Sequence, residues 1–224
     1  MIAHYDFSDG NLLDNEVGDS YALTKNGSGV TLNGDGSAQI ANGSGSNFLS
    51  ATGIGDGVNS AFTISIWFRT DTPNPATHSS IASGAASSTW QLENVQENGP
   101  RLNSGTSITG SSLLIADTWY QAVVWTNGTN SKLFMSEEGG SLTQIGATSN
   151  AALGLTDLRL GVNRGGNHNW EGDYANIQVY DEALSNTSIT TILDAGSGVA
   201  AVPEPSASAL LGLGSLALIL RRKK

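Results

Sequence analysis

Two carboxylates four residues apart, Glu93 and Glu97, come nearest in this sequence to an acid–base pair. Enzymes that cleave glycosidic bonds hold two carboxyl groups about 5–9.5 Å apart, and positions i and i+4 of a strand share one face. The residues around these two lack the aromatic and aspartate pattern of such a site. The alternative is that Glu93 and Glu97 are solvated residues at the end of a strand, beside the Asn98-Gly99 turn. We assign no catalytic residue.

Histidine and cysteine chemistry has even less support. The three histidines, His4, His78 and His168, lie far apart in polar or loop-like stretches, which is typical of solvent-exposed side chains. The chain has no cysteine, and this excludes a disulfide framework, a thiolate metal site and cysteine catalysis. We therefore expect a protein that is not an enzyme.

Two tryptophans, Trp90 and Trp170, are the candidates for ligand binding. Sugars bind where an aromatic face stacks on the ring and amides or carboxylates orient the hydroxyls. Trp90 follows a stretch rich in serine and alanine, and Trp170 ends a polar loop with many donors and acceptors. The alternative for Trp170 is that it packs inward. The remaining tryptophans lie on predicted strands and are expected to be framework: Trp67, Trp119 and Trp125.

The elements that position these side chains are predicted to be short strands. Residues alternate with period two over Ala61–Thr70, Tyr120–Trp125 and Tyr174–Tyr180, as in half-buried strands. Asn-Gly dipeptides separate further short strand-like runs, and only Ser188–Asp194 has the pattern of a short helix. Many short strands with almost no helix predict an all-β fold, a two-sheet antiparallel sandwich or jelly roll.

Five segments follow one another in a recognisable order. They are Phe7 with Asp9-Gly10 and Asp14, then Ala61–Phe68, Asp117–Val124, Leu158–Gly161, and Trp170–Tyr180 followed by Ala183-Leu184-Ser185. Together they run from about residue 4 to residue 193. Their order resembles that of bacterial laminin G-like domains, and this resemblance implies a concanavalin A-like jelly roll.

The same resemblance raises the question of one structural calcium ion. Such domains often bind calcium through acids near the first and last strands, and calcium prefers oxygen ligands. The closing strand here has Ala175 and Asn176 where many relatives have carboxylates. Asp6, Asp14 and Asp173 could still supply oxygen. The alternative is that these acids lie on the surface or stabilise turns. We assign no residue as a calcium ligand.

The charge of the chain is unevenly distributed. The whole chain has a net charge of -10, and residues 203–224 carry one glutamate against four basic residues. Residues 1–202 therefore carry about -13. Phosphate contacts need clustered Lys and Arg, so this acidic body is not expected to bind nucleic acid.

The C-terminus has three parts in a fixed order. Pro203, Glu204 and Pro205 precede the uncharged apolar stretch 206–220, and Arg221, Arg222, Lys223 and Lys224 end the chain. As a helix the stretch would span about 22 Å, which is shorter than a bilayer core of about 30 Å. Its basic end would stay cytoplasmic, with the acidic body outside. The alternative is a buried core helix with a solvated basic end.

This arrangement resembles the PEP-CTERM sorting signal of Gram-negative bacteria. The resemblance covers residues 202–224 and implies export, transient anchoring in the inner membrane and processing near Pro203-Glu204-Pro205 by an exosortase-type membrane enzyme. It also implies a leader peptide, but the strand-like segment at Ile2 has no basic and apolar leader before it. We therefore expect that the recorded start lies within a longer protein.

These observations predict three regions: a laminin G-like domain (1–196), a linker (197–202) and a sorting segment (203–224). We expect an exported cell-envelope or extracellular protein, with a non-catalytic binding or structural module. Its partners would be the processing enzyme, the membrane through 206–220, and an extracellular polysaccharide or surface protein. The alternative class is a sandwich-fold glycosidase or polysaccharide lyase.

Overall fold

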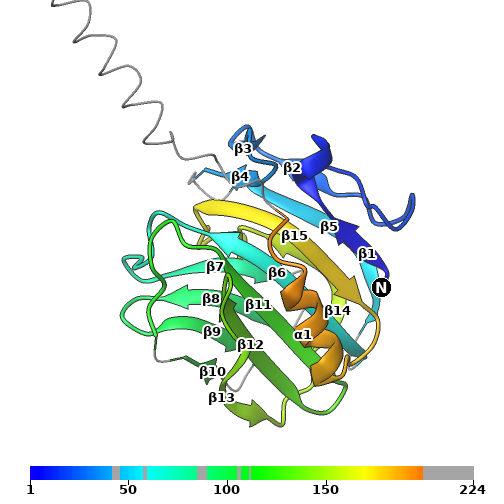
Figure 1. Ribbon diagram of the computed structural model, residues 1–224, viewed down its shortest axis with the longest axis vertical. Coiled ribbons are helices and arrows are strands. Elements are labelled where there is room, and N and C mark those ends of the chain that lie inside the picture. The colour runs from blue at the N-terminus through cyan, green and yellow to red at the C-terminus, as the bar shows by residue number, and fades with distance from the viewer. Residues whose placement is uncertain (42–45, 58–59, 85–89, 105–106, 111, 199–224) are drawn as a thin grey trace, which may run out of the picture.

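The computed structural model describes residues 1–41, 46–57, 60–84, 90–104, 107–110 and 112–198. These residues form two antiparallel sheets that pack face to face, as Figure 1 shows. The predicted all-β, two-sheet jelly-roll sandwich is confirmed. Within the described ranges, no helix has the length and apolar character needed to cross a bilayer. The apolar helix predicted at 206–220 lies outside those ranges.

The first sheet is built from eight strands, three of them very short. They are β1 (Ala3–Tyr5), β3 (Val30–Leu32), β4 (Ala38–Ile40), β6 (Ala61–Arg69), β11 (Tyr120–Asn127), β12 (Ser131–Glu137), β13 (Thr143–Ser149) and β15 (Gly172–Tyr180). Their order is β13-β12-β11-β6-β15-β4-β3, and β1 also pairs with β15. The first strand, β1, therefore lies beside β15, the last strand of the chain.

The second sheet has seven strands. They are β2 (Thr24–Asn26), β5 (Phe48–Gly57), β7 (His78–Ser83), β8 (Gln91–Val95), β9 (Gly99–Asn103), β10 (Ile108–Thr109) and β14 (Leu155–Leu160). Their order is β10-β9-β8-β7-β14-β5-β2. In both sheets the central strands pair with strands distant in sequence, such as β6 with β15 and β5 with β14, so the fold depends on long-range pairing. A single turn of 3-10 helix, η1 (Phe7–Asp9), follows β1.

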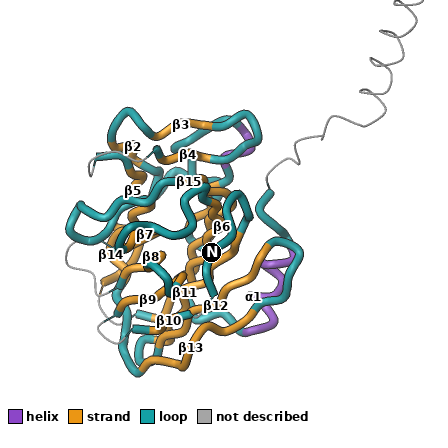
Figure 2. The backbone as a smooth tube through the Cα atoms, turned by 90° about the vertical axis from the view of Figure 1, so that its left-hand side faces the viewer, coloured by secondary structure: helices purple, strands orange, loops and turns teal. Residues whose placement is uncertain are grey.

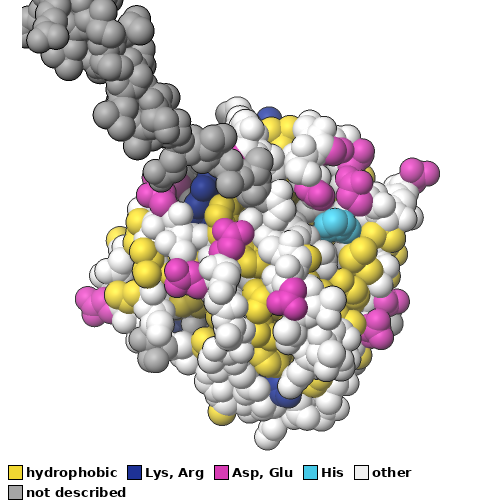
Figure 3. Space-filling model, viewed as in Figure 1, with side chains coloured by type: hydrophobic (Ala, Val, Ile, Leu, Met, Phe, Trp, Pro, Cys, Tyr) yellow, Lys and Arg dark blue, Asp and Glu magenta, His cyan; other side chains and the backbone are white. Residues whose placement is uncertain are grey.

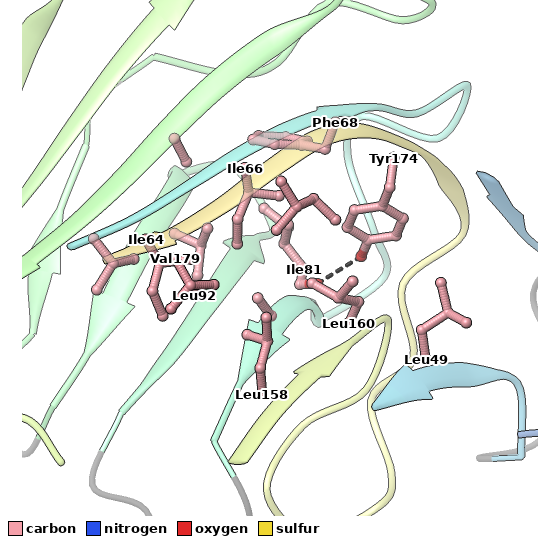
Figure 4. Close-up of a cluster of buried hydrophobic side chains, with 14 of the residues drawn as sticks. Leu49, Ile64, Ile66, Phe68, Ile81, Leu92, Leu158, Leu160, Tyr174 and Val179 are labelled. Carbon is pink, nitrogen blue, oxygen red and sulfur yellow. Dashed lines mark hydrogen bonds between the residues drawn. The ribbon is translucent and has the colours of Figure 1, made fainter. Parts of the chain in front are cut away.

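The core lies between the sheets and follows the predicted alternation. Phe62, Ile64 and Ile66 of β6 are fully buried and face the second sheet's Leu92 and Leu158, as Figure 4 shows for part of this cluster. Burial of such side chains contributes about 1.5–3 kcal/mol each. The alternating pattern of β6 therefore gives one face to the core.

A hydrogen bond between the sheets crosses this core. The Tyr174 hydroxyl on β15 donates to the Ile81 carbonyl oxygen on β7 at 2.5 Å, drawn as a dashed line in Figure 4. The ring is fully buried, and burial raises the pKa of this phenol well above its ordinary value. The hydroxyl therefore stays a donor at any physiological pH, and it ties the closing strand to the opposite sheet.

The helix α1 (Asn186–Asp194) covers the outer side of the first sheet (Figure 2). Ser185 caps its start by accepting a hydrogen bond from the Ser188 N–H. Ile189 packs on Val123 and Phe134, and Leu193 packs in a cluster with Trp67. The predicted helix at 188–194 is confirmed and begins two residues earlier.

Candidate functional site

The second sheet carries polar side chains on the face turned away from the core. The alternation around Leu92 and Leu102, both buried in the core, turns their neighbours outward. Cross-strand pairing then arranges them in two rows, Ser83–Gln91–Asn103 and Ser80–Glu93–Arg101. We call these six residues, together with the adjacent His78 and His168, the polar face. Ser80, Ser83, Gln91 and Glu93 are buried, so its accessible members are Arg101, Asn103 and the two histidines. The helix α1 lies on the other sheet and does not cover it (Figure 2).

Glu93 is the centre of the polar face. One carboxylate oxygen, Oε2, accepts hydrogen bonds from Nε of Arg101 at 2.8 Å and from its Nη2 at 2.5 Å. The other oxygen, Oε1, accepts from the Gln91 amide and lies 3.7 Å from Nε2 of His78. The Glu93 side chain is 1% exposed, whereas that of Arg101 is 26% exposed. The buried carboxylate therefore fixes an accessible guanidinium in place.

Two histidines meet beside this carboxylate. The rings of His78 and His168 stack with centroids 3.8 Å apart. Burial lowers the pKa of His78, and the nearby His168 and Arg101 also lower it, against the opposing effect of Glu93. His78 is therefore neutral at neutral pH, where one ring nitrogen donates and the other accepts. His168 is exposed.

The loop 163–169 brings His168 to this position. Asn163 and Asn167 close the loop, since the Asn163 amide donates to Oδ1 of Asn167 at 2.6 Å and the Asn167 N–H donates back to Oδ1 of Asn163 at 2.9 Å. The Ser80 N–H on β7 donates to the His168 carbonyl oxygen at 3.0 Å. The contact joins positions far apart in the chain, so the sequence contained no local signal for it.

The predicted carboxylate pair is separated in the structure. Glu93 lies on β8, whereas Glu97 is exposed in the turn between β8 and β9, with a left-handed φ of 60°. The expectation that the two would share a strand face is wrong, because β8 ends at Val95. Both oxygens of Glu93 already accept hydrogen bonds. The buried carboxylate therefore orients the donor groups around it.

The two predicted sugar-stacking rings are inside the protein. Trp90 is 0% exposed and its indole N–H donates to the Gly154 carbonyl oxygen at 3.1 Å. Trp170 is 1% exposed and meets the Phe68 ring edge-on at 5.5 Å. Neither ring offers a face to a ligand, so the structure gives no support to stacking on either. The position of Trp170 is that of the inward-packing alternative.

Two of the three acids considered for calcium bond to other groups of the protein, and the third is exposed. Asp173 accepts from Nε and Nη2 of Arg69, at 3.0 and 2.6 Å, and from the Asn33 amide at 3.0 Å. Asp6 caps η1, and Asp14 is exposed. In the part of the chain that the structure describes, no group of acids and histidines is arranged to hold a metal. The structural calcium ion considered from the sequence stays a prediction without assigned ligands.

The predicted sorting residues lie outside the described ranges. They are Pro203, Glu204 and Pro205, with Arg221, Arg222, Lys223 and Lys224. The domain boundary placed at residue 196 stays a prediction.

Two family models match this chain. The model of the concanavalin A-like lectin/glucanases superfamily matches residues 22–190, and the model of the PEP-CTERM protein-sorting motif matches residues 201–224. The chain therefore belongs to the concanavalin A-like lectin/glucanases superfamily and carries a PEP-CTERM sorting motif. This motif is the signal of exosortase substrates and implies export with membrane-associated sorting. A comparison with curated proteins finds no match.

Solved structures share the fold. Domain 4 of AbnA, an extracellular arabinanase from Geobacillus stearothermophilus, was solved in complex with arabinotriose. It has a TM-score of 0.60 at 18% identity, over 86% of this chain and 97% of that domain. The ligand binding domain of botulinum neurotoxin serotype D, in complex with N-acetylneuraminic acid, has a TM-score of 0.64 at 13% identity, over 87% of this chain and 50% of that one. The chain thus spans about half of the neurotoxin domain.

Proposed function

We propose that this protein is an exported, non-catalytic module that binds an uncharged extracellular polysaccharide through the polar face. The observation that carries the proposal is the Glu93-centred cluster, in which a buried carboxylate orients the partly exposed Arg101 on the sheet opposite α1. Its accessible groups are the Arg101 guanidinium, the His78 ring and the exposed His168. Sugar hydroxyls can bond to all three groups, because the guanidinium donates and a neutral imidazole has one donor nitrogen and one acceptor nitrogen.

The sorting segment supports a location of this module in the cell envelope or outside the cell. We propose that an exosortase-type enzyme processes the chain near Pro203-Glu204-Pro205, after the stretch 206–220 has anchored it transiently in the membrane. The likeness to an arabinanase domain solved with arabinotriose supports a glycan as the ligand class and suggests arabinan as the first probe.

The alternative is a sandwich-fold glycosidase or lyase. It would need Glu93 to act with a second group, and a carboxylate whose two oxygens already accept hydrogen bonds is poorly placed to give or take a proton. We therefore propose binding without cleavage.

The first test is made on the protein recovered from its native host. Intact mass and C-terminal peptide mapping should show loss of the chain after the Pro-Glu-Pro motif, with the body outside the cell. The recovered protein is then passed over immobilised arabinan, a neutral glucan and a polyuronate. We expect retention on a neutral polysaccharide, and His168→Ala should weaken it about five- to tenfold, as for the loss of one good hydrogen bond.

The matched control is Glu97→Gln, a change at an exposed residue of the turn. It should leave retention unchanged. A folded protein that no neutral polysaccharide retains would overturn the binding role. Sugar release that disappears in Glu93→Gln would instead establish the glycosidase or lyase.

A further inference from the structure

Separate from the polar face, a pocket lies at one end of the sandwich, between the two sheets. It has a volume of about 520 Å³, within the usual range of small-molecule sites. Its walls come from both sheets: Phe62 at the start of β6 belongs to the first, and Ile54 of β5 and Leu155 of β14 belong to the second. We call it the edge pocket. It lies near the N-terminus and β1, since Ile2 also lines it (Figure 1).

The floor of the edge pocket is apolar and rigid. Ile54, Phe62 and Leu155 are at most 2% exposed and belong to the main core. Gly55 also lines the pocket, and a Cβ at this position would lie 2.2 Å from the Leu155 carbonyl oxygen. The close approach of β5 and β14 therefore requires glycine at this point of the wall.

An aromatic ring is held over this floor. Tyr21 is half-buried, packs against the core and lines the pocket. Its φ of 62° lies in the left-handed region, which is rare for a bulky residue. The buried Tyr5 hydroxyl holds it there by donating to the Tyr21 carbonyl oxygen at 2.7 Å. The structure thus maintains an unfavourable backbone conformation that places this ring at the pocket.

The polar groups of the pocket have no partners among the described residues. Asp181, directly after β15, has an exposed carboxylate that makes no hydrogen bond or ion pair there, and the same holds for the hydroxyls of Tyr21 and Ser60. No Lys or Arg lines the pocket. One tyrosine, an apolar floor, one carboxylate and two hydroxyls therefore line the same pocket, and the polar groups make no bond to one another.

From this convergence we infer that the edge pocket is a second binding site, which takes a single sugar ring without negative charge. The C–H face of the ring packs on Tyr21, and adjacent hydroxyls donate to the two oxygens of Asp181. The carboxylate repels a uronate or a sialic acid and favours a neutral or amino sugar. The site is separate from the polar face, and it stands whether or not a polysaccharide binds there.

The test is saturation-transfer NMR on the full chain with three probes: D-glucose, D-glucosamine and D-glucuronate. We expect millimolar binding of glucose, tighter binding of glucosamine, and no signal for glucuronate. Asp181→Asn should weaken glucosamine binding about tenfold, because it removes a charge-assisted hydrogen bond. Tyr21→Leu should weaken glucose binding about fivefold.

Glu182→Gln is the matched control, since this neighbouring acid is exposed and its side chain does not line the pocket. It should leave all three probes unchanged. His168→Ala on the polar face should also leave them unchanged, which separates this site from the proposed polysaccharide surface. Equal binding of glucuronate and glucose, an equal effect of Glu182→Gln and Asp181→Asn, or no binding of any probe by the folded protein would overturn the inference. Thermal unfolding of each variant verifies that it is folded.

Discussion

At the scale of single residues, Glu93 has the most demanding environment in the polar face. Its carboxylate is buried and is balanced by hydrogen bonds from Arg101 and Gln91. Removing one partner of such a pair leaves an uncompensated charge. We predict that Glu93→Gln lowers the free energy of unfolding by about 2 kcal/mol, less than for a fully buried pair because Arg101 is partly exposed. Urea denaturation measures this loss. Glu97→Gln should change it by less than about 0.5 kcal/mol, and equal losses would contradict the assignment.

The neighbouring His78 predicts a pH dependence of stability. Its folded pKa is lowered, chiefly by burial, with His168 and Arg101 acting in the same direction and Glu93 against it. Around the ordinary value of about 6.5 the unfolded chain therefore binds more protons than the folded one. The free energy of unfolding should fall as the pH drops below that value. In His78→Gln this fall should be shallower between about pH 7 and pH 5. Parallel stability curves for the two proteins would refute the prediction.

At the scale of elements, α1 determines which sheet face remains available. The alternation of β6 predicts one buried face, yet Trp67 on its other side is also fully buried, because Leu193 of α1 packs in the same cluster. We predict that Ile189→Ala lowers the free energy of unfolding by about 2–4 kcal/mol, through lost burial and a cavity against Val123 and Phe134. Thr190→Ala, at an exposed position, should cost less than about 1 kcal/mol. Guanidinium titrations of both variants measure the difference, and similar losses would show that α1 is not a packed cover.

Strand β5 shows where local pattern is insufficient. Its sequence, Phe48–Gly57, contains three glycines and no sustained alternation, and the sequence did not predict it as a strand. Pairing with β2 on one side and β14 on the other creates it, with a register shift near Leu155 and Asp157. Tertiary contacts therefore overrule weak strand propensity, and the same pairing builds one wall of the edge pocket.

At the scale of the whole molecule, charge limits the choice of ligand. Acidic side chains are spread over the face that Figure 3 shows, with few Lys or Arg among them. The body carries about -13 over residues 1–202. Its field repels polyanions at low salt, and this repulsion is screened within about 10 Å at 0.1 M salt. Both binding proposals therefore name sugars without negative charge, and the polyuronate and glucuronate probes test them in the same direction.

The sequence by itself determined the class of protein. Period-two alternation in β6, β11 and β15 indicates which side chains of each strand face the core. The segment from Pro203 to Lys224 is a contiguous motif that can be recognised without a fold. Both follow from neighbouring residues alone, so they could be predicted without coordinates.

Only the tertiary structure decided the sites. It buried Trp90 and Trp170, which sequence had selected for stacking, and it moved Glu97 into a turn. It brought His78 against His168, and it placed Tyr21 near Asp181 at the edge pocket. The physical reason is that strand register and sheet order set which distant side chains share a face, and those depend on pairing across the whole chain.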